Sequence, residues 1–390
     1  MQIVHTSDWH IGHKLYDKSR EIEHKLFFQW LYSFIKEQRV ELLLVSGDIF
    51  DSSIPSNSSL KIYYDFLISL QDTECKSVII TAGNHDLPST LDAPKEILKT
   101  LNIYIFAKAE NELNSMILPI KNSNIILLPI PFLRDRDIRV AIANENIDNI
   151  NQRYRKALIK YYCKLADECK KISGNNIFIA MGHLFATGTK VGDSESTIYV
   201  GGVGDISADD FPDIFDYIAL GHLHKAQKVG GKEHIRYSGS PIPLSFSEAK
   251  QDSKIILLNI EEDIKIEEIT VPRFRDIVTI KGNLYQIQNR LKEISATSSN
   301  LTPWVEIISY ENIDIYNKIK KLITNSEVLK ISTSHKKEFG DIKTEYIPLS
   351  SLTPEEIFKN KCRDEGFDLD SNRQIEDIFY EILSDIREDR

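Results

Sequence analysis

The sequence predicts an α/β fold built from buried strands that alternate with amphipathic helices. The first observation is a set of five apolar runs of strand length, each ending in small and then polar residues. Continuous runs rich in Val, Ile and Leu are typical of strands buried on both faces. The second observation is that apolar residues recur at helical spacing within 20–38, 58–71 and 151–172. Strands and helices that alternate along the chain indicate an α/β domain.

Each of the five runs ends in side chains that can bind metal ions. The runs are IVHTSDWH, LLLVSGD, VIITAGNHD, IFIAMGH and YIALGHLH. Their candidate ligands are Asp8, His10, Asp48, Asn84, His183, His222 and His224. In α/β sheets, binding groups gather outside the carboxyl ends of the strands. We therefore expect these loops to converge, although more than 200 residues separate the first from the last.

The chemistry of this ligand set suits two divalent cations. Imidazole, carboxylate and amide groups without a thiolate favour ions such as manganese, zinc or iron. Seven ligands are too many for one tetrahedral zinc, but they suit two ions that share a carboxylate. Asp48 stands alone at a tight Ser-Gly turn and is the best candidate for the shared ligand. Two ions about 3.5–4 Å apart can clamp a phosphate and lower the pKa of a bridging water.

Other polar residues near these motifs receive separate predictions. His85 lies beside Asn84 without necessarily binding a metal, and it could protonate a leaving oxygen. For Asp86 we favour a structural role over that of orienting His85. Trp9 is expected to pack or orient between two ligands. His5 and His24 are expected to be structural, and three further histidines are expected at the surface: His13, His234 and His335.

Composition and charge argue against a general nucleic-acid binder, a membrane-spanning protein and a secreted protein. The formal net charge of −10 argues against a general nucleic-acid binder, although two divalent cations would add positive charge at one site. We find no apolar run of about 18 residues and expect no membrane span. The opening MQIVHTSDWHIG has no basic n-region, so we expect no signal peptide. Four scattered cysteines without a C-x-x-C pair fit a cytoplasmic protein.

The chain changes character after Pro272. The segments DIVTIKG, WVEIISY and VLKISTS, with helices near 284–295 and 312–324, predict a small βαβαβ unit. We predict three parts of the chain: a main domain that carries the metal-binding motifs (1–272), a small α/β capping domain (273–346) and a C-terminal helical segment (347–390). Residues 184–204 are rich in Gly, Ser and Thr and predict a long loop near the site.

The C-terminal segment is predicted to form two helices. SLTPEEIF has a Ser or Thr cap, an early proline and two glutamates in the first turn. The second helix carries one apolar stripe, formed by Ile375, Ile378, Phe379, Ile382, Leu383 and Ile386. This stripe could pack on the chain's own body or dock on another protein.

Taken in order, DWHIG, GDIFD, GNHD, GH and GHLH resemble the motifs of the calcineurin-like metallophosphoesterases. Four longer segments resemble the bacterial DNA-repair nuclease subunits of that family, which pair with a coiled-coil ATPase: HTSDWHIG, GDIFDSSIPS, YIALGHLHKAQ and IRYSGSPIPLSFSEA. The resemblance is strong over 1–272 and includes LTPEEIF in the tail. It implies a four-layer α/β/β/α sandwich with a small α/β cap domain and a C-terminal helical pair.

The resemblance also implies roles for the candidate residues. One metal would be held by Asp8, His10, Asp48 and His224, and the other by Asp48, Asn84, His183 and His222. His85 would be the catalytic histidine. One departure from the family pattern is Asp51, where archaeal and eukaryotic members carry a second histidine. We assign Asp51 no catalytic part.

The activity implied is manganese-dependent cleavage of DNA, as an exonuclease on duplex ends and an endonuclease on single strands or hairpins. The partners implied are the coiled-coil ATPase, bound by the C-terminal helices, and a second copy of the chain, bound through helices that include 58–71. Basic residues near the motifs could contact the DNA backbone but are more often surface charges: Arg134, Arg136, Arg139, Lys190 and Lys225. Arg236 could form a structural salt bridge instead.

Two other functions remain open from the residues alone. One is a phosphodiesterase acting on small nucleotides, because the same site hydrolyses many phosphate esters. The other is a scaffold that regulates an ATPase and keeps a vestigial site. The cap and the apolar stripe favour the nuclease, and the complete ligand set argues against the scaffold. The sequence has no G-x-x-x-x-G-K-[ST] loop, so any ATP dependence would come from the partner.

Overall fold

The computed structural model describes residues 1–109, 112–134, 147–186, 189, 206–296, 301–311, 314–321, 323, 326–333 and 358. The chain divides into two compact units, Met1–His335 and Lys336–Arg390. Apart from Phe358, which is helical, the predicted C-terminal helices lie outside the described residues. So do most of the predicted loop 184–204 and the side chains of Arg136, Arg139, Lys190 and His335.

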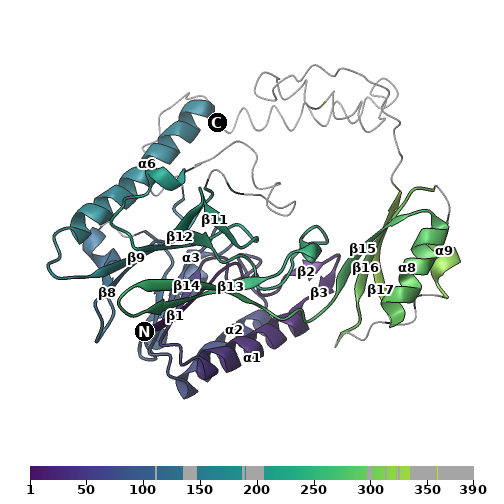
Figure 1. Ribbon diagram of the computed structural model, residues 1–390, viewed down its shortest axis with the longest axis horizontal. Coiled ribbons are helices and arrows are strands. Elements are labelled where there is room, and N and C mark those ends of the chain that lie inside the picture. Colours follow the sequence, from purple (N-terminus) through teal and green to yellow (C-terminus); the bar gives the residue numbers. More distant parts are fainter. Residues whose placement is uncertain are drawn as a thin grey trace. The chain divides into compact units, whose positions relative to one another are not determined.

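The first six-stranded sheet forms one half of the body (Figure 1). Its strands, in spatial order, are β14 (Ile264–Thr270), β13 (Lys254–Ile260), β1 (Gln2–Thr6), β4 (Leu42–Ser46), β5 (Ser77–Thr81) and β6 (Ile103–Phe106). The last four are parallel, and β13 and β14 add an antiparallel edge. A small hairpin, β2 (Lys14–Leu15) and β3 (Lys18–Ser19), follows β1.

The second six-stranded sheet repeats this plan. Its strands, in spatial order, are β11 (Gln227–Val229), β12 (Lys232–Tyr237), β10 (Tyr217–Gly221), β9 (Ile177–His183), β8 (Ile125–Pro129) and β7 (Leu118–Pro119). The central four are parallel, with antiparallel strands at both edges. The two sheets therefore each present a row of parallel strand ends.

Alternate side chains along each central strand enter different hydrophobic cores. In β4, Leu42 and Leu44 join the core between the two sheets, whereas Leu43 and Val45 join the core beneath the helices. The strands of the second sheet alternate in the same way between the inter-sheet core and a third core on their outer face. Because both faces of the strands are buried, their sequences read as unbroken apolar runs.

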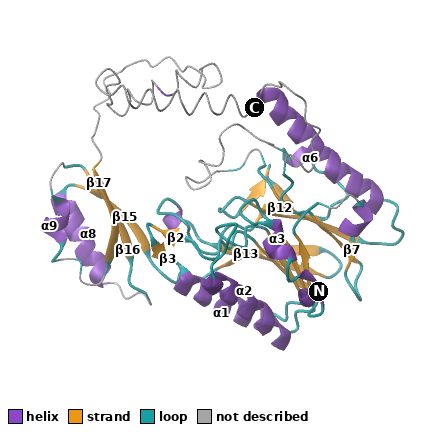
Figure 2. Cartoon of the chain, turned by 180° about the vertical axis from the view of Figure 1, so that it is seen from behind, coloured by secondary structure: helices purple, strands orange, loops and turns teal. Residues whose placement is uncertain are grey.

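Helices cover the outer face of each sheet and complete four layers, which confirms the predicted α/β/β/α sandwich. The helices of the body are α1 (Glu21–Glu37), α2 (Asn57–Ser69), α3 (Pro88–Asp92), α4 (Lys95–Lys99) and α6 (Ile147–Cys169). Figure 2 shows α1 and α2 side by side, with α6 on the opposite side of the strands. No helix among the described residues is long and apolar enough to cross a membrane.

Short 3-10 turns lie in the connections between strands and helices. The start of α2 is capped by the side chain of Ser56. The 3-10 turns are η1 (Leu70–Asp72), η2 (Leu113–Met116), η3 (Ala208–Asp210) and η4 (Glu248–Lys250). The Ser56 hydroxyl accepts a hydrogen bond from the Ser59 N–H, 3.1 Å away, which satisfies one of the free donors at the start of α2.

The segment after Pro272 forms the predicted βαβαβ unit. Its elements are β15 (Ile277–Gly282), α8 (Leu284–Ala296), β16 (Trp304–Ser309), α9 (Ile315–Ile319) and β17 (Glu327–Thr333). The three strands are parallel and share a small apolar core with the helices. α9 is shorter than the predicted helix near 312–324.

A buried ion cluster joins this unit to α1. The Glu23 carboxylate accepts hydrogen bonds from Arg20 Nε and Arg275 Nε, both at 2.8 Å. The Arg275 guanidinium lies 4.2 Å from the ring centroid of Trp304, and Trp304 packs in one apolar cluster with Phe246. Because buried charges require partners, Glu23 links α1 to the segment that leads into the βαβαβ unit.

Candidate metal centre

The five predicted motif loops converge at the carboxyl ends of β1, β4, β5, β9 and β10. Backbone hydrogen bonds hold the first two loops together, from Asp8 N to Gly47 O and from His10 N to Asp48 O, each 3.0 Å long. The packing of the two sheets brings the strand ends of both to one place. All seven predicted ligands take part: Asp8, His10, Asp48, Asn84, His183, His222 and His224.

The ligand atoms fall into two groups with Asp48 between them. The first group is Asp8, His10 and His224, whose donor atoms all lie within 4.8 Å of one another. Asp48 Oδ2 lies 3.6 Å from His10 Nε2 on this side. The same oxygen lies 3.3 Å from His183 Nε2 on the other side. The Asp48 carboxylate is therefore placed where a ligand shared by two ions would stand.

The second group forms around the side-chain oxygen of Asn84. Asn84 Oδ1 lies 2.9 Å from His183 Nε2 and 3.0 Å from His222 Nδ1. His183 is buried, whereas Asn84 and His222 are half-buried. This group therefore offers an amide oxygen and two imidazoles at the accessible side of the site.

Burial and mutual attraction set the charges of the centre. Burial raises the pKa of Asp8 to about 6 and lowers the pKa of His10 to about 4. Burial also opposes charge on Asp48 and His183, yet their attraction lowers the pKa of Asp48 and raises the pKa of His183 to about 9. Among the described residues, neither ring nitrogen of His10 makes a hydrogen bond, although carboxylate oxygens of Asp51 and Asp48 lie 3.4 Å from Nδ1 and 3.6 Å from Nε2. A buried cluster of carboxylates and imidazoles with orphaned nitrogens fits divalent cations.

Four of these side chains project from backbone that favours glycine. The φ angles are 52° at Asp8, 47° at His10, 50° at Asp48 and 107° at His222. Positive φ is uncommon for residues other than glycine and concentrates at functional sites. The turns also pass close to one another, because a Cβ atom at Gly221 would overlap the Ser46 carbonyl oxygen. The close approach of these turns therefore explains why a residue as small as glycine precedes the ligand His222.

His85 lies beside both groups, and its orientation is fixed. Its backbone N–H donates to Asp48 Oδ1 at 2.9 Å, and its Nδ1 lies 3.0 Å from the backbone oxygen of Asp51. A carbonyl oxygen can only accept a hydrogen bond, so Nδ1 carries the proton and Nε2 remains for other chemistry. The centroids of the His85 and His10 rings are 4.9 Å apart.

Asp86 is structural, as predicted. Its buried carboxylate accepts hydrogen bonds from the backbone N–H groups of Gly83, Ile49 and Phe50. Burial raises the pKa of Asp86 to about 6. The carboxylate therefore ties the loop after β5 to the loop after β4, and it holds Asn84 and His85 in register with Asp48.

The predicted structural residues near the site are buried. The Trp9 indole donates to Thr6 Oγ1 at 3.1 Å. His24 is a buried residue of α1, with Nε2 2.8 Å from the Trp9 carbonyl oxygen. The Nδ1 of His5 lies 3.0 Å from the Tyr217 hydroxyl.

The predictions that His13 and His234 lie at the surface are wrong, because both side chains are half-buried. His13 is half-buried, with Nδ1 2.9 Å from Asp51 Oδ1 and Nε2 2.9 Å from the Leu244 carbonyl oxygen. Its nearness to His10 in sequence and the nearness of Asp51 to Asp48 could have indicated this contact. Glu248, whose Oε1 lies 3.4 Å from His224 Nδ1, belongs to the segment IRYSGSPIPLSFSEA that resembles the family, but no role was predicted for it from the sequence.

Three basic residues of the sequence analysis lie among the described residues, and they make different contacts. Arg134 Nη2 donates to the Asp86 carbonyl oxygen at 3.1 Å, beside the site. Lys225 is half-buried next to His224. Arg236 forms ion pairs with Glu233 and Glu268, which confirms its predicted structural role.

Comparison with known proteins identifies the family. Residues 1–226 match the family model of the calcineurin-like phosphoesterases. SbcD, the nuclease subunit of SbcCD, from Escherichia coli strain K12 is 35% identical over 97% of this chain and 97% of its own length. The chain belongs to the SbcD family of calcineurin-like phosphoesterases.

Other members of the SbcD family are more distant. The SbcD protein of Rhodobacter capsulatus is 32% identical over 70% of each chain. The SbcD protein of Staphylococcus epidermidis is 28% identical over 75% of each chain. Residues 273–365 match a second family model, described as the type 5 capsule protein repressor C-terminal domain. The calcineurin-like phosphoesterases bind divalent metal ions, in agreement with the ligand groups of this chain.

Proposed function

We propose that this chain is the nuclease subunit of an SbcCD-type complex and hydrolyses DNA phosphodiester bonds with two divalent metal ions, most favourably manganese. The observation that carries the proposal is the convergence of seven ligand side chains and His85 at the strand ends, in a chain of this family. The proposed activities are exonuclease on duplex ends and endonuclease on single strands and hairpins, in DNA repair and recombination. Manganese suits imidazole and oxygen ligands without thiolate.

Each residue has a defined part in this mechanism. Asp8, His10, Asp48 and His224 would hold one ion, and Asp48, Asn84, His183 and His222 the other. When bound, the two cations supply the charge that holds a phosphate and activates a water molecule. His85, fixed through its Nδ1 by the Asp51 carbonyl oxygen, presents Nε2 for protonation of the leaving oxygen.

The runner-up function is a phosphodiesterase acting on small nucleotides, since this kind of site serves many phosphate esters. The nuclease is favoured by full-length similarity to SbcD, which includes the cap domain. A scaffold with a vestigial site is disfavoured, because all seven ligands and His85 are gathered in one place.

The direct test is cleavage of end-labelled duplex and single-stranded DNA with added manganese, beside a small phosphodiester such as bis-p-nitrophenyl phosphate. We expect DNA cleavage that a chelator abolishes and manganese restores. A variant with the Asp167→Asn change, at an exposed position of α6, should cleave like the wild type. Turnover of the small ester without DNA cleavage, even with an SbcC-type ATPase present, would overturn the nuclease proposal.

Two protein partners complete the proposal. The first is an SbcC-type coiled-coil ATPase, which we propose binds to the C-terminal segment 347–390.

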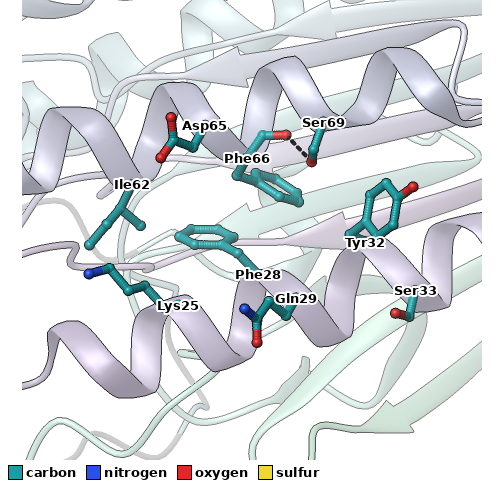
Figure 3. Close-up of a pocket in the computed structure, with 9 residues that line it drawn as sticks. All are labelled: Lys25, Phe28, Gln29, Tyr32, Ser33, Ile62, Asp65, Phe66 and Ser69. Carbon is teal, nitrogen blue, oxygen red and sulfur yellow. Dashed lines mark hydrogen bonds between the residues drawn. The ribbon is translucent and has the colours of Figure 1, made fainter.

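The second is another copy of this chain, bound through α1 and α2. A groove of about 490 Å³ lies between these helices. Figure 3 shows Phe28 of α1 and Phe66 of α2 facing each other in the groove, with ring centroids 4.5 Å apart. Both rings are buried in this chain's own core, so the apolar surface offered to a second copy comes from the exposed Ile22 of α1 and Ile68 of α2.

We predict that Ile68→Glu separates the two copies of the dimer. Ile68 lies on α2 with 58% of its surface exposed, so the substitution should leave the fold intact. Sedimentation velocity should give a dimer for the wild type and a monomer for the variant. Ile97→Glu on α4 is the matched control, because Ile97 is also exposed, and it should remain dimeric. A monomeric wild type or a dimeric Ile68→Glu variant would contradict this interface.

A further inference from the structure

The imidazoles of the two ligand groups have different partners behind them. We call Asp8, His10 and His224 the Asp8 half, and Asn84, His183 and His222 the Asn84 half. Asp48 stands between the halves. The partner on the far nitrogen of a ligand imidazole fixes its tautomer and tunes its basicity. A difference in these partners is therefore a difference in how strongly each half holds a cation.

In the Asp8 half, both imidazoles face a carboxylate. His10 Nδ1 lies 3.4 Å from Asp51 Oδ1, and His224 Nδ1 lies 3.4 Å from Glu248 Oε1. Glu248 and the ring of His10 are buried, and Asp51 is half-buried. A carboxylate behind Nδ1–H leaves Nε2 as a stronger donor toward a metal ion.

In the Asn84 half, the partner on the far nitrogen of His183 is neutral. His183 Nδ1 lies 2.9 Å from the Ser46 carbonyl oxygen, which only accepts a hydrogen bond. His222 turns its Nδ1 toward the amide oxygen of Asn84, 3.0 Å away, so this nitrogen faces the ligand group itself. Apart from the shared Asp48, each half has one oxygen ligand of its own. In this half it is the neutral amide of Asn84, whereas in the other half it is the carboxylate of Asp8.

The backbone of Leu244 contacts Glu248 directly and Asp51 through His13. The Leu244 N–H donates to Glu248 Oε2 at 2.8 Å, and the Leu244 carbonyl oxygen lies 2.9 Å from His13 Nε2. His13 in turn contacts Asp51 Oδ1 through its other nitrogen, at 2.9 Å. The carboxylates behind both rings are therefore anchored to one residue of the loop that leads into η4.

We propose that Asp51 and Glu248 are positioning residues that make the two halves of the metal centre unequal, so that the Asp8 half binds a divalent cation more tightly than the Asn84 half. The inference rests on the proposed metal centre and does not require that DNA is the substrate. Filling is then stepwise: the first ion binds to Asp8, His10 and His224 with Asp48, and the second binds at Asn84. The second ion is the one that a falling metal concentration removes first.

The test is titration of the metal-free full chain with manganese, followed by the electron paramagnetic resonance signal of the free ion. We expect two ions per chain with dissociation constants that differ by about tenfold or more. Asn84→Ala should remove the weaker constant and leave the tighter one unchanged. Two equal constants in the wild type, or loss of the tighter constant in Asn84→Ala, would overturn the inference.

The positioning residues are tested by Asp51→Asn and Glu248→Gln, which keep size and remove charge. Each should weaken the tighter constant by about 10–100-fold and leave the weaker one unchanged. Asp167→Asn is the matched control and should change neither constant. Circular dichroism checks the fold of each variant. If one variant does not fold, the other variant and the wild-type titration still decide the question.

The outcomes separate this inference from the proposed function. A chain that binds no manganese would overturn the metal centre and with it the proposed function. Two ions bound with equal strength would overturn only the inequality of the halves. Unequal binding that is insensitive to both Asp51→Asn and Glu248→Gln would remove the positioning role of these carboxylates.

Discussion

Asp48→Ala should lose bound metal and lower DNA cleavage at least about 10³-fold, because one carboxylate lies between both ligand groups. The substitution also removes the acceptor of the His85 N–H. Manganese content after gel filtration, measured by elemental analysis, should fall below that of the wild type. Cleavage of end-labelled duplex DNA should fall in parallel.

Asp48→Asn is the companion variant, because it keeps the size of the side chain and one oxygen ligand. We expect it to bind less metal than the wild type and more than Asp48→Ala. The far-UV circular dichroism of both variants should match the wild type, since the strands that carry the loop are held by cores away from it. Two ions retained in Asp48→Ala would show that Asp48 is not the shared ligand.

His85→Ala should keep both metal ions and lose about 10²–10⁴-fold in turnover, the range for a missing general acid. The structure allows a competing role, since a His85 ring nitrogen also lies within 4.8 Å of ligand atoms of His10 and Asp48. Metal content distinguishes the two roles. Single-turnover cleavage at saturating manganese then measures the chemical step by itself.

His234→Ala is the matched control for this experiment. His234 is a half-buried histidine on β12, and its position is not among the ligand groups. It should keep both the metal content and the turnover of the wild type. If His85→Ala emptied the centre of metal, its assignment as the acid would be wrong and a ligand role would replace it.

The ligands could be predicted because they follow a rule of chain geometry. Parallel strands that start in the same direction end at the same edge, so polar residues after Val- and Ile-rich runs must gather there. Asp8, Asp48 and Asn84 gather at the edge of the first sheet for this reason, and His183 and His222 at the edge of the second, and the packing of the two sheets joins the two sets. The α/β layers followed from the same runs, because strands covered on both faces have no polar alternation.

The residues behind the ligands could not be predicted in the same way. The contact of His13 with Leu244 joins segments 231 residues apart. Glu248 belongs to a segment that resembles the family, but it lies in a short 3-10 turn with no periodic pattern, so nothing in that segment relates it to His224. The buried contact of Glu23 with Arg275 likewise joins α1 to a distant segment. Such pairs depend on how irregular loops pack in three dimensions, and a single sequence does not encode that locally.

The positive φ angles of the ligand loops link metal binding to the stability of the whole fold. Each such residue costs of order 1 kcal/mol in the folded chain, and four of the ligands are affected. A glycine at position 8 or 48 would relieve this strain while it removes a ligand. The centre is thus a site where natural selection for activity and selection for thermal stability favour opposite residues.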